Sequence, residues 1–437
     1  MKRLPMFFQK WKGDGFLSKV LVLAGGTVVA QGLHVLLSPL LTRLYTPSDF
    51  GVLMVFISIV GICSKVVDLR YPLAIPLPSE RDKALHLLVL SLLLTLITTT
   101  IMTSTLFLIG EDLLSLFSAG ELQRYYWLVG LSMMGIGFYQ SLNHWAIRNR
   151  DYVLITITKM NQSIVQLSVQ LIFGFLKLGN IGLLIGDSLG RMGGSGLLAS
   201  LVWKKHKKDL QVISVRKMLE VAKLYRRFPL YSSWSSLLNG IALHITPLLI
   251  AMNYGTGVAG LWALSERVVG APMGLIGTAV AQVYFGEGAK YAREEPKKFQ
   301  EMFDTTAKHL FMWGLIPTIL FMVISPWLFP FIFGEEWKDA GVFVQILAIM
   351  YLAQFTMSPL STTLDILQKQ NWELVWDLSR VLLVVVGISL ASYFHLSASL
   401  AVFIYSTVMC SSYIALYILC KVAIRQLVKS SSLSSNT

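Results

Sequence analysis

Charged side chains are scarce in this sequence. Asp, Glu, Lys and Arg make up only 14% of the 437 residues, whereas a soluble globular domain carries about 25% charged residues. Hydrophobic residues make up 54%, and the mean hydropathy is +0.63. A chain with so little polar surface cannot face water on all sides, so its composition excludes a soluble protein and indicates a bilayer environment.

Cysteines and catalytic patterns are scarce as well. The three cysteines, Cys63, Cys410 and Cys420, lie within or at the edge of apolar stretches, which argues against a disulfide or metal framework. The chain has no Ser/His/Asp or Cys/His constellation, no metal-spaced cluster and no Walker sequence. We therefore predict no catalytic residue, no metal and no cofactor, and ATP-driven transport would need another subunit.

Long apolar stretches dominate what remains. A spanning helix needs about 20 mostly apolar residues, and the sequence contains twelve such stretches. The predicted fold class is an all-α polytopic membrane protein in two pseudo-symmetric six-helix bundles around a central cavity. The predicted spans are 20–41, 50–71, 84–109, 124–147, 152–175, 181–203, 229–252, 258–285, 308–333, 341–364, 372–393 and 398–420.

The basic residues support this topology. A net charge of +13 could suit nucleic acid, but the cations lie between apolar spans and not on a soluble module. Of the 37 Lys and Arg residues, 27 fall in segments that twelve spans place in the cytoplasm and four fall in outer loops. Nine lie in the central segment 204–228 alone. We therefore expect both termini in the cytoplasm and no nucleic-acid partner.

The two halves resemble each other weakly. Aligning Gly51 with Gly260 gives an offset of 209 residues, and nearly the same offset pairs His34 with His244. Six spans followed by six more, each half starting inside, form a parallel repeat of the kind that places a transporter's substrate site at the repeat interface. The expected organisation is an N-terminal bundle at 1–203, a basic linker at 204–228, a C-terminal bundle at 229–420 and a cytoplasmic tail at 421–437.

Four ionisable residues lie deep in the predicted spans. An ionisable side chain at the bilayer centre costs about 2.5–3.5 kcal/mol, so it usually faces a bundle interior or a cavity. Asp187 and Arg191 are spaced i, i+4 beside glycines that repeat every four residues, which favours a structural ion pair at a tight helix crossing. Glu266 and Arg267 are adjacent and point about 100° apart, so they cannot pair on one face.

Three further residues are candidates for a polar cavity. His34 and His244 are repeat-related and near mid-depth; a neutral imidazole bonded to a neighbouring helix is the alternative for each. Lys65 lies near the inner end of its span, where it could instead extend its amine to the membrane surface.

Two regions resemble Wzx-type polysaccharide flippases, the oligosaccharide flippase family related to MATE multidrug extruders and lipid II flippases. One consists of TRLYTPSDFGV followed by LRYPLAIPLP at 69–78, and the other is NYGTGVAGLWALSERVVGAPMGLIGTAVAQVYF at 253–285. The resemblance implies alternating access and transfer of undecaprenyl-diphosphate-linked oligosaccharide across the bacterial inner membrane. On the matching spans it assigns the cavity to Lys65, Arg267, His34 and His244. The spans offer few deep cations, which argues against a strongly acidic glycan.

The resemblance also suggests a polysaccharide polymerase and a chain-length regulator as partners, besides the lipid-linked oligosaccharide and the bilayer itself. Energy could come from an H⁺ or Na⁺ gradient, with Glu266 or Asp187 as the coupling group. Two other functions stay open. A MATE-like drug exporter would share the fold but favour carboxylates in its cavity. A membrane polymerase or acyltransferase would be expected to carry a large external loop or a catalytic His/Asp pattern, and the sequence has neither.

Overall fold

The computed structural model describes residues 16–117, 120–149, 151–206 and 213–434, and within these ranges it contains helices and no strand. The chain forms two compact units, Met1–Gly260 (unit 1) and Leu261–Thr437 (unit 2). Each predicted span corresponds to a helix, which confirms the predicted all-α membrane class. Among the described residues, seven helical stretches are both long and apolar enough to cross a bilayer by themselves.

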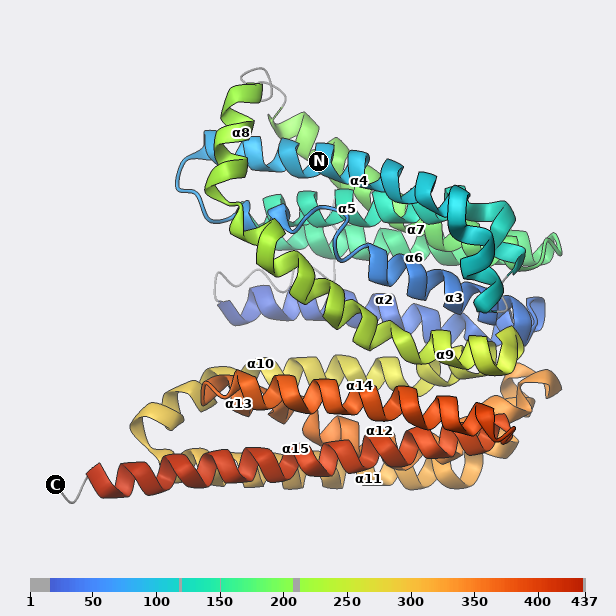
Figure 1. Ribbon diagram of the computed structural model, residues 1–437, viewed down its shortest axis with the longest axis vertical. Helices are drawn as coiled ribbons and strands as arrows, with labels where there is room; N and C mark the ends of the chain where they lie inside the picture. The colour runs from blue at the N-terminus through green and yellow to red at the C-terminus, as the bar shows by residue number, and fades with distance from the viewer. Residues whose placement is uncertain (1–15, 118–119, 150, 207–212, 435–437) are drawn as a thin grey trace. The chain divides into compact units, whose positions relative to one another are not determined.

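Unit 1 is built from long helices that run side by side (Figure 1). Neighbours within it include α6 with α7, α2 with α6, α5 with α7 and α4 with α5. The elements are α2 Phe16–Leu44, α3 Pro47–Cys63, η1 Tyr71–Ala74, α4 Arg81–Leu116, η2 Gly120–Tyr125, α5 Tyr126–Arg148, α6 Tyr152–Phe175, α7 Asn180–His206, α8 Val215–Leu224, the π-helix η4 Phe228–Ser232 and α9 Ser233–Ser265.

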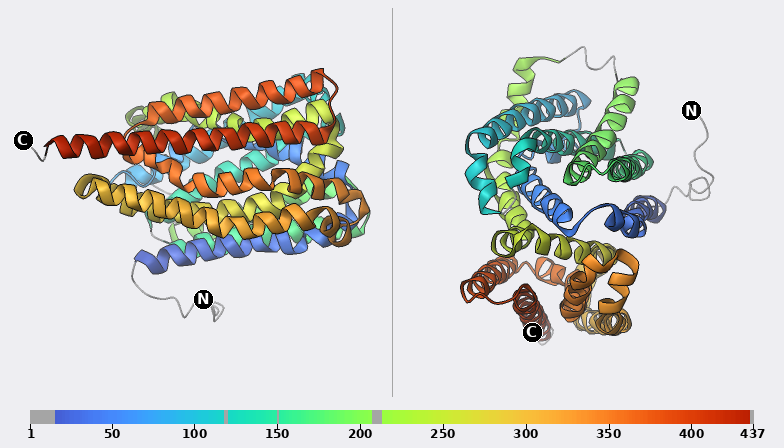
Figure 2. Two further views of the ribbon diagram at one scale, coloured as in Figure 1. Left: turned by 90° about the horizontal axis from the view of Figure 1, so that it is seen from below. Right: turned by 90° about the vertical axis from the view of Figure 1, so that its right-hand side faces the viewer.

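Unit 2 also consists of long helices, and in it α12 packs against both α11 and α15 (Figure 2). Its elements are the π-helix η5 Glu266–Gly270, α10 Ala271–Glu294, α11 Pro296–Phe333, η6 Glu335–Trp337, α12 Lys338–Met357, η7 Pro359–Ser361, α13 Thr362–Ile366, α14 Gln370–Tyr393 and α15 Ala398–Ser434. The predicted tail 421–437 therefore begins as a continuation of α15.

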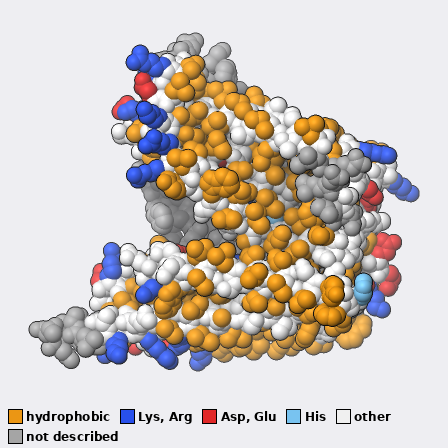
Figure 3. All heavy atoms as spheres, in the orientation of Figure 1, with side chains coloured by type: hydrophobic (Ala, Val, Ile, Leu, Met, Phe, Trp, Pro, Cys, Tyr) orange, Lys and Arg blue, Asp and Glu red, His pale blue; other side chains and the backbone are white. Residues whose placement is uncertain are grey.

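The sides of the helices are apolar. Leu108, Ile316 and Phe331 expose 85%, 75% and 81% of their surface, which hydrocarbon would cover in a bilayer. In Figure 3 hydrophobic side chains cover the lateral surface, and charged side chains gather toward the ends of the helices. This distribution is that of a multi-pass membrane protein.

The turn between predicted spans 7 and 8 lies within α9. Gly255 there has φ 84° and ψ 169°, a backbone conformation that glycine alone adopts without strain, and it separates the two spans. The two compact units divide five residues later, at Gly260, whereas the predicted domain boundary was the linker 204–228. Span 7 thus belongs to the compact unit of the N-terminal spans, and the predicted division by repeats stays a prediction.

The glycine ridge of α7 has the predicted role. Tyr45 and a row of glutamines from α6 fill the space that the glycines leave, and a Cβ at any of these glycines would lie within 3 Å of them. Side-chain amides of the same row then donate to α7, as Gln170 does to the carbonyl oxygen of Leu183 at 3.1 Å. The opposing pairs are Gly182–Tyr45, Gly186–Gln170, Gly190–Gln166 and Gly194–Gln162.

Span 2 corrects the prediction of a continuous helix over 50–71. Helix α3 ends at Cys63, and residues 64–70 form turns in which Leu69 and Arg70 have φ of 48° and 60°. Pro72, Pro76 and Pro78 follow, and each proline lacks the N–H that a helix would need. The second half of span 2 is therefore irregular.

Candidate functional site

The candidate site is built around this irregular stretch, residues 64–80, which we call the 64–80 segment. The hydroxyl of Thr98 donates to the carbonyl oxygen of Val67. Thr98 lies 17 positions after Arg81, the first residue of α4, which at 1.5 Å per residue places it about 25 Å along the helix. The 64–80 segment thus runs beside the apolar part of α4, at membrane depth. Non-helical backbone at such depth is tolerated where protein buries it or where it lines a polar cavity.

Arg148 at the end of α5 binds residues 75–79 of the 64–80 segment. Its guanidinium donates to the carbonyl oxygens of Ile75 and Pro76, each at 3.3 Å, to that of Pro78, and to that of Ser79 at 3.2 Å. The backbone N–H groups of Ile75 and Leu77 bond to the carbonyl oxygens of Pro72 and Ala74 instead, and the arginine supplies a donor to the four later carbonyls. One arginine side chain thus replaces the hydrogen bonds of a missing helical turn.

A buried acid, Asp68, lies nearer the start of the 64–80 segment. Asp68 is fully buried, and its Oδ1 accepts the backbone N–H of Arg70 at 2.9 Å. The charge of Arg70 acts on both Asp68 and His144 of α5. Asp68 thereby stabilises the left-handed turn at Arg70, and the turn keeps a cation inside unit 1.

Lys65 and His244 come together where α3 meets α9. A Cβ at Gly61 of α3 would lie 2.3 Å from Nε2 of His244, and a Cβ at Gly240 of α9 would lie 2.7 Å from Cγ of Lys65. Each helix thus offers a glycine that accepts the long side chain of the other. Two of the predicted cavity residues are therefore neighbours, although 179 positions separate them in the sequence.

Arg191 lies on α7, which packs against α3, the helix that leads into Lys65. As its spacing predicts, Arg191 also pairs with Asp187, with Nε 2.6 Å from Oδ2 and a second bond of 3.1 Å. The predicted structural ion pair is present, and its arginine contributes to a group of cations. We call Lys65, Arg191 and His244 the cation cluster.

The other predicted residues are described within their own units. His34 is half-buried on α2 of unit 1, and Arg267 is half-buried in η5 of unit 2. Glu266 lies beside the hydroxyl of Tyr351 on α12. The hydroxyl of Ser265 donates to the carbonyl oxygen of Ala340 at 3.1 Å and ties the start of η5 to α12.

Two glycines bring the outer ends of α3 and α9 into backbone contact. A Cβ at Gly51 would lie 1.7 Å from the carbonyl oxygen of Thr256, and a Cβ at Gly260 would lie 1.7 Å from that of Pro47. The hydroxyls of Ser48 and Thr256 are 3.0 Å apart. Gly51 and Gly260, the two glycines that the repeat alignment pairs, therefore lie in contact. Their lack of side chains lets the two backbones touch directly at this end.

A family model described as polysaccharide biosynthesis protein matches residues 40–342, well over half of the chain. The chain belongs to this family. The matched region contains the 64–80 segment, the cation cluster and both contacting glycines. Among curated proteins, the lipopolysaccharide biosynthesis protein WzxC of Escherichia coli K12 is 28% identical over 141 residues. That match takes in 32% of this chain and 28% of WzxC, so the chain covers less than a third of that relative.

Solved structures share the fold of this family member. The lipid II flippase MurJ, in an inward closed conformation, has a TM-score of 0.69 at 13% identity, with 94% of this chain and 91% of MurJ covered. An inward-facing MATE multidrug transporter has a TM-score of 0.67 at 18% identity, with 94% and 96% covered. At such identities the likeness shows the fold alone.

Sequence reasoning missed three parts of this site. The prolines at 72, 76 and 78 were a readable signal of the break in span 2. Arg148 was counted only as a cytoplasmic charge, and its role depends on where the free carbonyls lie. Arg191 was assigned to a structural pair alone, because no spacing indicates that α7 brings it near His244.

Proposed function

We propose that this member of the polysaccharide biosynthesis family is a flippase of the bacterial inner membrane. It moves undecaprenyl-diphosphate-linked oligosaccharide repeat units from the cytoplasmic to the periplasmic leaflet by alternating access. The physical task is to pass a polar headgroup through about 30 Å of hydrocarbon while the lipid tail stays in it. No bond is made or broken in this transfer, so the protein does not act as an enzyme.

The observation that carries the proposal is the cation cluster. Lys65, Arg191 and His244 bring three nitrogen-bearing side chains from three parts of unit 1 to one place at membrane depth. A diphosphate is the most strongly charged part of the substrate, and Lys and Arg are the side chains that bind phosphate oxygens best.

The 64–80 segment supports the same function. An irregular segment held by one arginine and several single hydrogen bonds can change shape at less cost than a continuous helix. It includes Lys65, so a change in its backbone would move a phosphate-binding amine. This arrangement couples substrate binding to a change of conformation.

Glu266 is the coupling group that we favour. Both carboxylate oxygens of Asp187 accept hydrogen bonds from Arg191, so they are occupied by a guanidinium and are poorly placed to bind a coupling ion. Glu266 lies instead in a distorted turn of unit 2 beside a tyrosine hydroxyl. Glu266→Gln should therefore abolish the gradient dependence of transport, whereas Asp187→Asn should mainly reduce stability; retained gradient dependence in Glu266→Gln contradicts the assignment.

The decisive experiment uses a deletion strain of the source organism. We expect complete undecaprenyl-linked repeat units to accumulate on the cytoplasmic face, as judged by protection from an impermeant probe, and to clear when the gene is restored. Restoring Lys65→Gln should leave transport at least ten-fold lower, and Lys65→Arg should keep most of it. Lys290→Gln, an exposed cytoplasmic lysine, is the matched control. Repeat units that still reach the outer face in the deletion strain would exclude this function.

A cation-coupled exporter of small molecules is the second candidate. The observation in its favour is the fold shared with MATE transporters over nearly the whole chain. Under this alternative the deletion strain becomes sensitive to cationic drugs and its surface polysaccharide stays normal. Co-purification of a polysaccharide polymerase or a chain-length regulator with the tagged protein would favour the flippase.

A further inference from the structure

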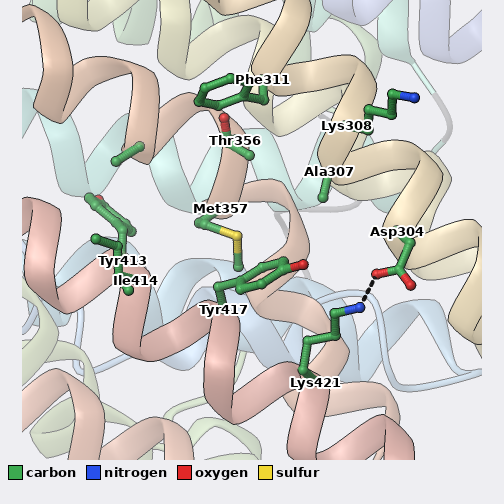
Figure 4. A pocket seen from close by; sticks show the side chains of 11 residues that line it. Asp304, Ala307, Lys308, Phe311, Thr356, Met357, Tyr413, Ile414, Tyr417 and Lys421 are labelled. Carbon is green, nitrogen blue, oxygen red and sulfur yellow. Dashed lines mark hydrogen bonds and ion pairs between the residues drawn. The ribbon is translucent and has the colours of Figure 1, made fainter.

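Unit 2 contains a groove that the proposed transport does not use. It lies between α11, α12 and α15 and encloses about 460 Å³ (Figure 4). The pocket opens where α11 leaves the cytoplasmic segment and where α15 approaches the C-terminus. The lining residues are Asp304, Ala307, Lys308, Phe311, Ala353, Thr356, Met357, Tyr413, Ile414, Tyr417 and Lys421.

One part of the groove is apolar and open. Ala307 and Ala353 are small, so they leave space between the helices, and Phe311, Met357 and Ile414 form its walls. Phe311 and Ile414 expose 47% and 60% of their surface. Both lie in predicted spans, where hydrocarbon would cover this exposed surface. A hydrocarbon chain fits this part of the groove, and a hydrophilic solute does not.

The other part is cationic. Nζ of Lys421 lies 2.6 Å from Oδ1 of Asp304 and 5.7 Å from the centre of the Tyr417 ring. Lys308 projects from the next turn of α11 and is exposed, as Figure 4 shows. Arg425, also exposed, follows Lys421 by one turn on α15. Two lysines, Lys308 and Lys421, and one carboxylate, that of Asp304, line the groove, so its local charge is positive.

The position of the groove at the cytoplasmic side of the membrane indicates which kind of molecule binds in it. Positive-inside bias places the start of α11 and the end of α15 at the cytoplasmic surface, where the headgroups of the inner leaflet lie. Basic pockets between spanning helices on this side suit anionic lipid headgroups. We propose that the groove binds an anionic phospholipid of the cytoplasmic leaflet, with its phosphate at Lys308 and Lys421 and one acyl chain against Phe311 and Ile414. This inference does not depend on the transported substrate.

The test uses the full-length protein in detergent, titrated with phosphatidylglycerol and, separately, with phosphatidylcholine, and read by native mass spectrometry. We expect the protein to retain phosphatidylglycerol preferentially. Lys308→Gln should weaken that binding by roughly five-fold, the effect of removing one basic residue at an anionic surface. Lys290→Gln, an exposed lysine of α10 outside the groove, should leave it unchanged. Equal effects of the two substitutions would overturn the proposal.

Two further measurements separate the alternatives. Ala353→Leu fills the apolar part and leaves every charge in place, so it should also weaken binding; unchanged binding would overturn the proposal. Because Lys421→Gln alone would leave Asp304 unpaired, the charge is removed there as the double variant Asp304→Asn, Lys421→Gln, with the melting temperature as the check on folding. If undecaprenyl phosphate displaces phosphatidylglycerol at an equal or lower concentration, the groove takes the lipid carrier and the phospholipid assignment is wrong.

Discussion

Span 2 and span 8 occupy equivalent places in the two repeats and yet differ in structure. Gly51 and Gly260 are 209 positions apart, and so are Gly61 and Gly270. In span 2 the α-helix ends at Cys63, and the 64–80 segment continues with turns and the 3₁₀-helix η1, whose backbone bonds run from residue i to residue i−3. Span 8 stays helical from α9 through η5 into α10 and has one π-turn.

The same glycine position serves different contacts in the two spans. Gly61 accepts the ring of His244 from another helix, whereas Gly270 accepts the carboxylate of Glu266 from the preceding turn, since a Cβ there would lie 2.1 Å from Oε2. Gly61 thus lies beside a cation-rich site in unit 1, and Gly270 lies beside an acid in unit 2.

Prolines contribute to the difference in backbone. Three of them within seven residues, at 72, 76 and 78, directly follow predicted span 2, and they oppose a return to regular helix after the turns at 64–70. Span 8 has only Pro272 in this part, and a single missing N–H is accommodated by the π-turn, in which Ala271 donates to the carbonyl oxygen of Glu266. Pro272 is thus accommodated by one shifted backbone hydrogen bond in span 8, whereas the stretch with Pro72, Pro76 and Pro78 lacks a regular α-helical turn.

The largest expected effect comes from joining the outer ends of the two spans. Ser48→Cys with Thr256→Cys replaces hydroxyls that are 3.0 Å apart, and oxidation should form a disulfide that holds the ends together. Transport should then stop and return on reduction, because alternating access requires this end to open. The measurement is outer-leaflet repeat units with and without reductant, and each single cysteine variant is a control. Full transport in the oxidised double variant would show that this contact stays closed throughout.

Separating the same ends is the second prediction. Gly51→Ala places a methyl group 1.7 Å from a backbone carbonyl that cannot move without shifting α9, so the closed contact should fail to form. We expect transport to fall at least ten-fold, and a cysteine at Ser48 to become more reactive toward a membrane-impermeant thiol reagent. Gly274→Ala in α10, where a Cβ meets nothing within 4 Å, is the matched control. Equal effects of the two substitutions would contradict the role of the glycine contact.

Removing the support of the 64–80 segment is the third. Arg148→Ala leaves the carbonyl oxygens of Ile75, Pro76, Pro78 and Ser79 without their donor, at a cost of about 2–4 kcal/mol in the free energy of unfolding. Arg148→Lys should lose less, because it keeps the charge without the planar fork. The melting temperature in detergent checks both, against the exposed Arg124→Ala as control. Span 8 stays helical over the corresponding residues, so this loss should be specific to span 2.

The smallest effect concerns the linker helix α8 beside span 2. Lys217 of α8 lies 2.8 Å from Asp82 of α4, and this bond holds the pKa of Asp82 below its usual value. Both side chains are 40% or more exposed, so Lys217→Gln should cost less than about 1 kcal/mol. Because the folded pKa is lowered, the stabilisation is present above the unfolded pKa of about 3.9 and is lost as the pH falls below it. Melting at pH 7 and at acid pH measures the difference, and a loss as large as that of Arg148→Ala would show that α8 carries the segment instead.

Much of the fold was predictable from hydropathy and charge. Both signals act locally and repeat many times, so the twelve spans and the helical class emerge even where single boundaries are wrong. The Asp187–Arg191 pair was predictable for the same reason, since i, i+4 neighbours on one helix lie together whatever surrounds them. The extent of span 2 was predicted incorrectly, because a count of apolar residues over 50–71 does not register the turns that the structure has at 64–70.

The amino-acid sequence by itself determined the solvent, the number of spans, their orientation and the α7 ridge, because these depend on transfer free energies and on spacing within one element. Only the tertiary structure decided which distant residues share a site. Lys65, Arg191 and His244 meet because glycines on α3 and α9 let two helices approach, and Arg148 matters because three prolines leave carbonyls free within its reach. Such contacts depend on packing between segments that are far apart in the chain, and no local pattern records them.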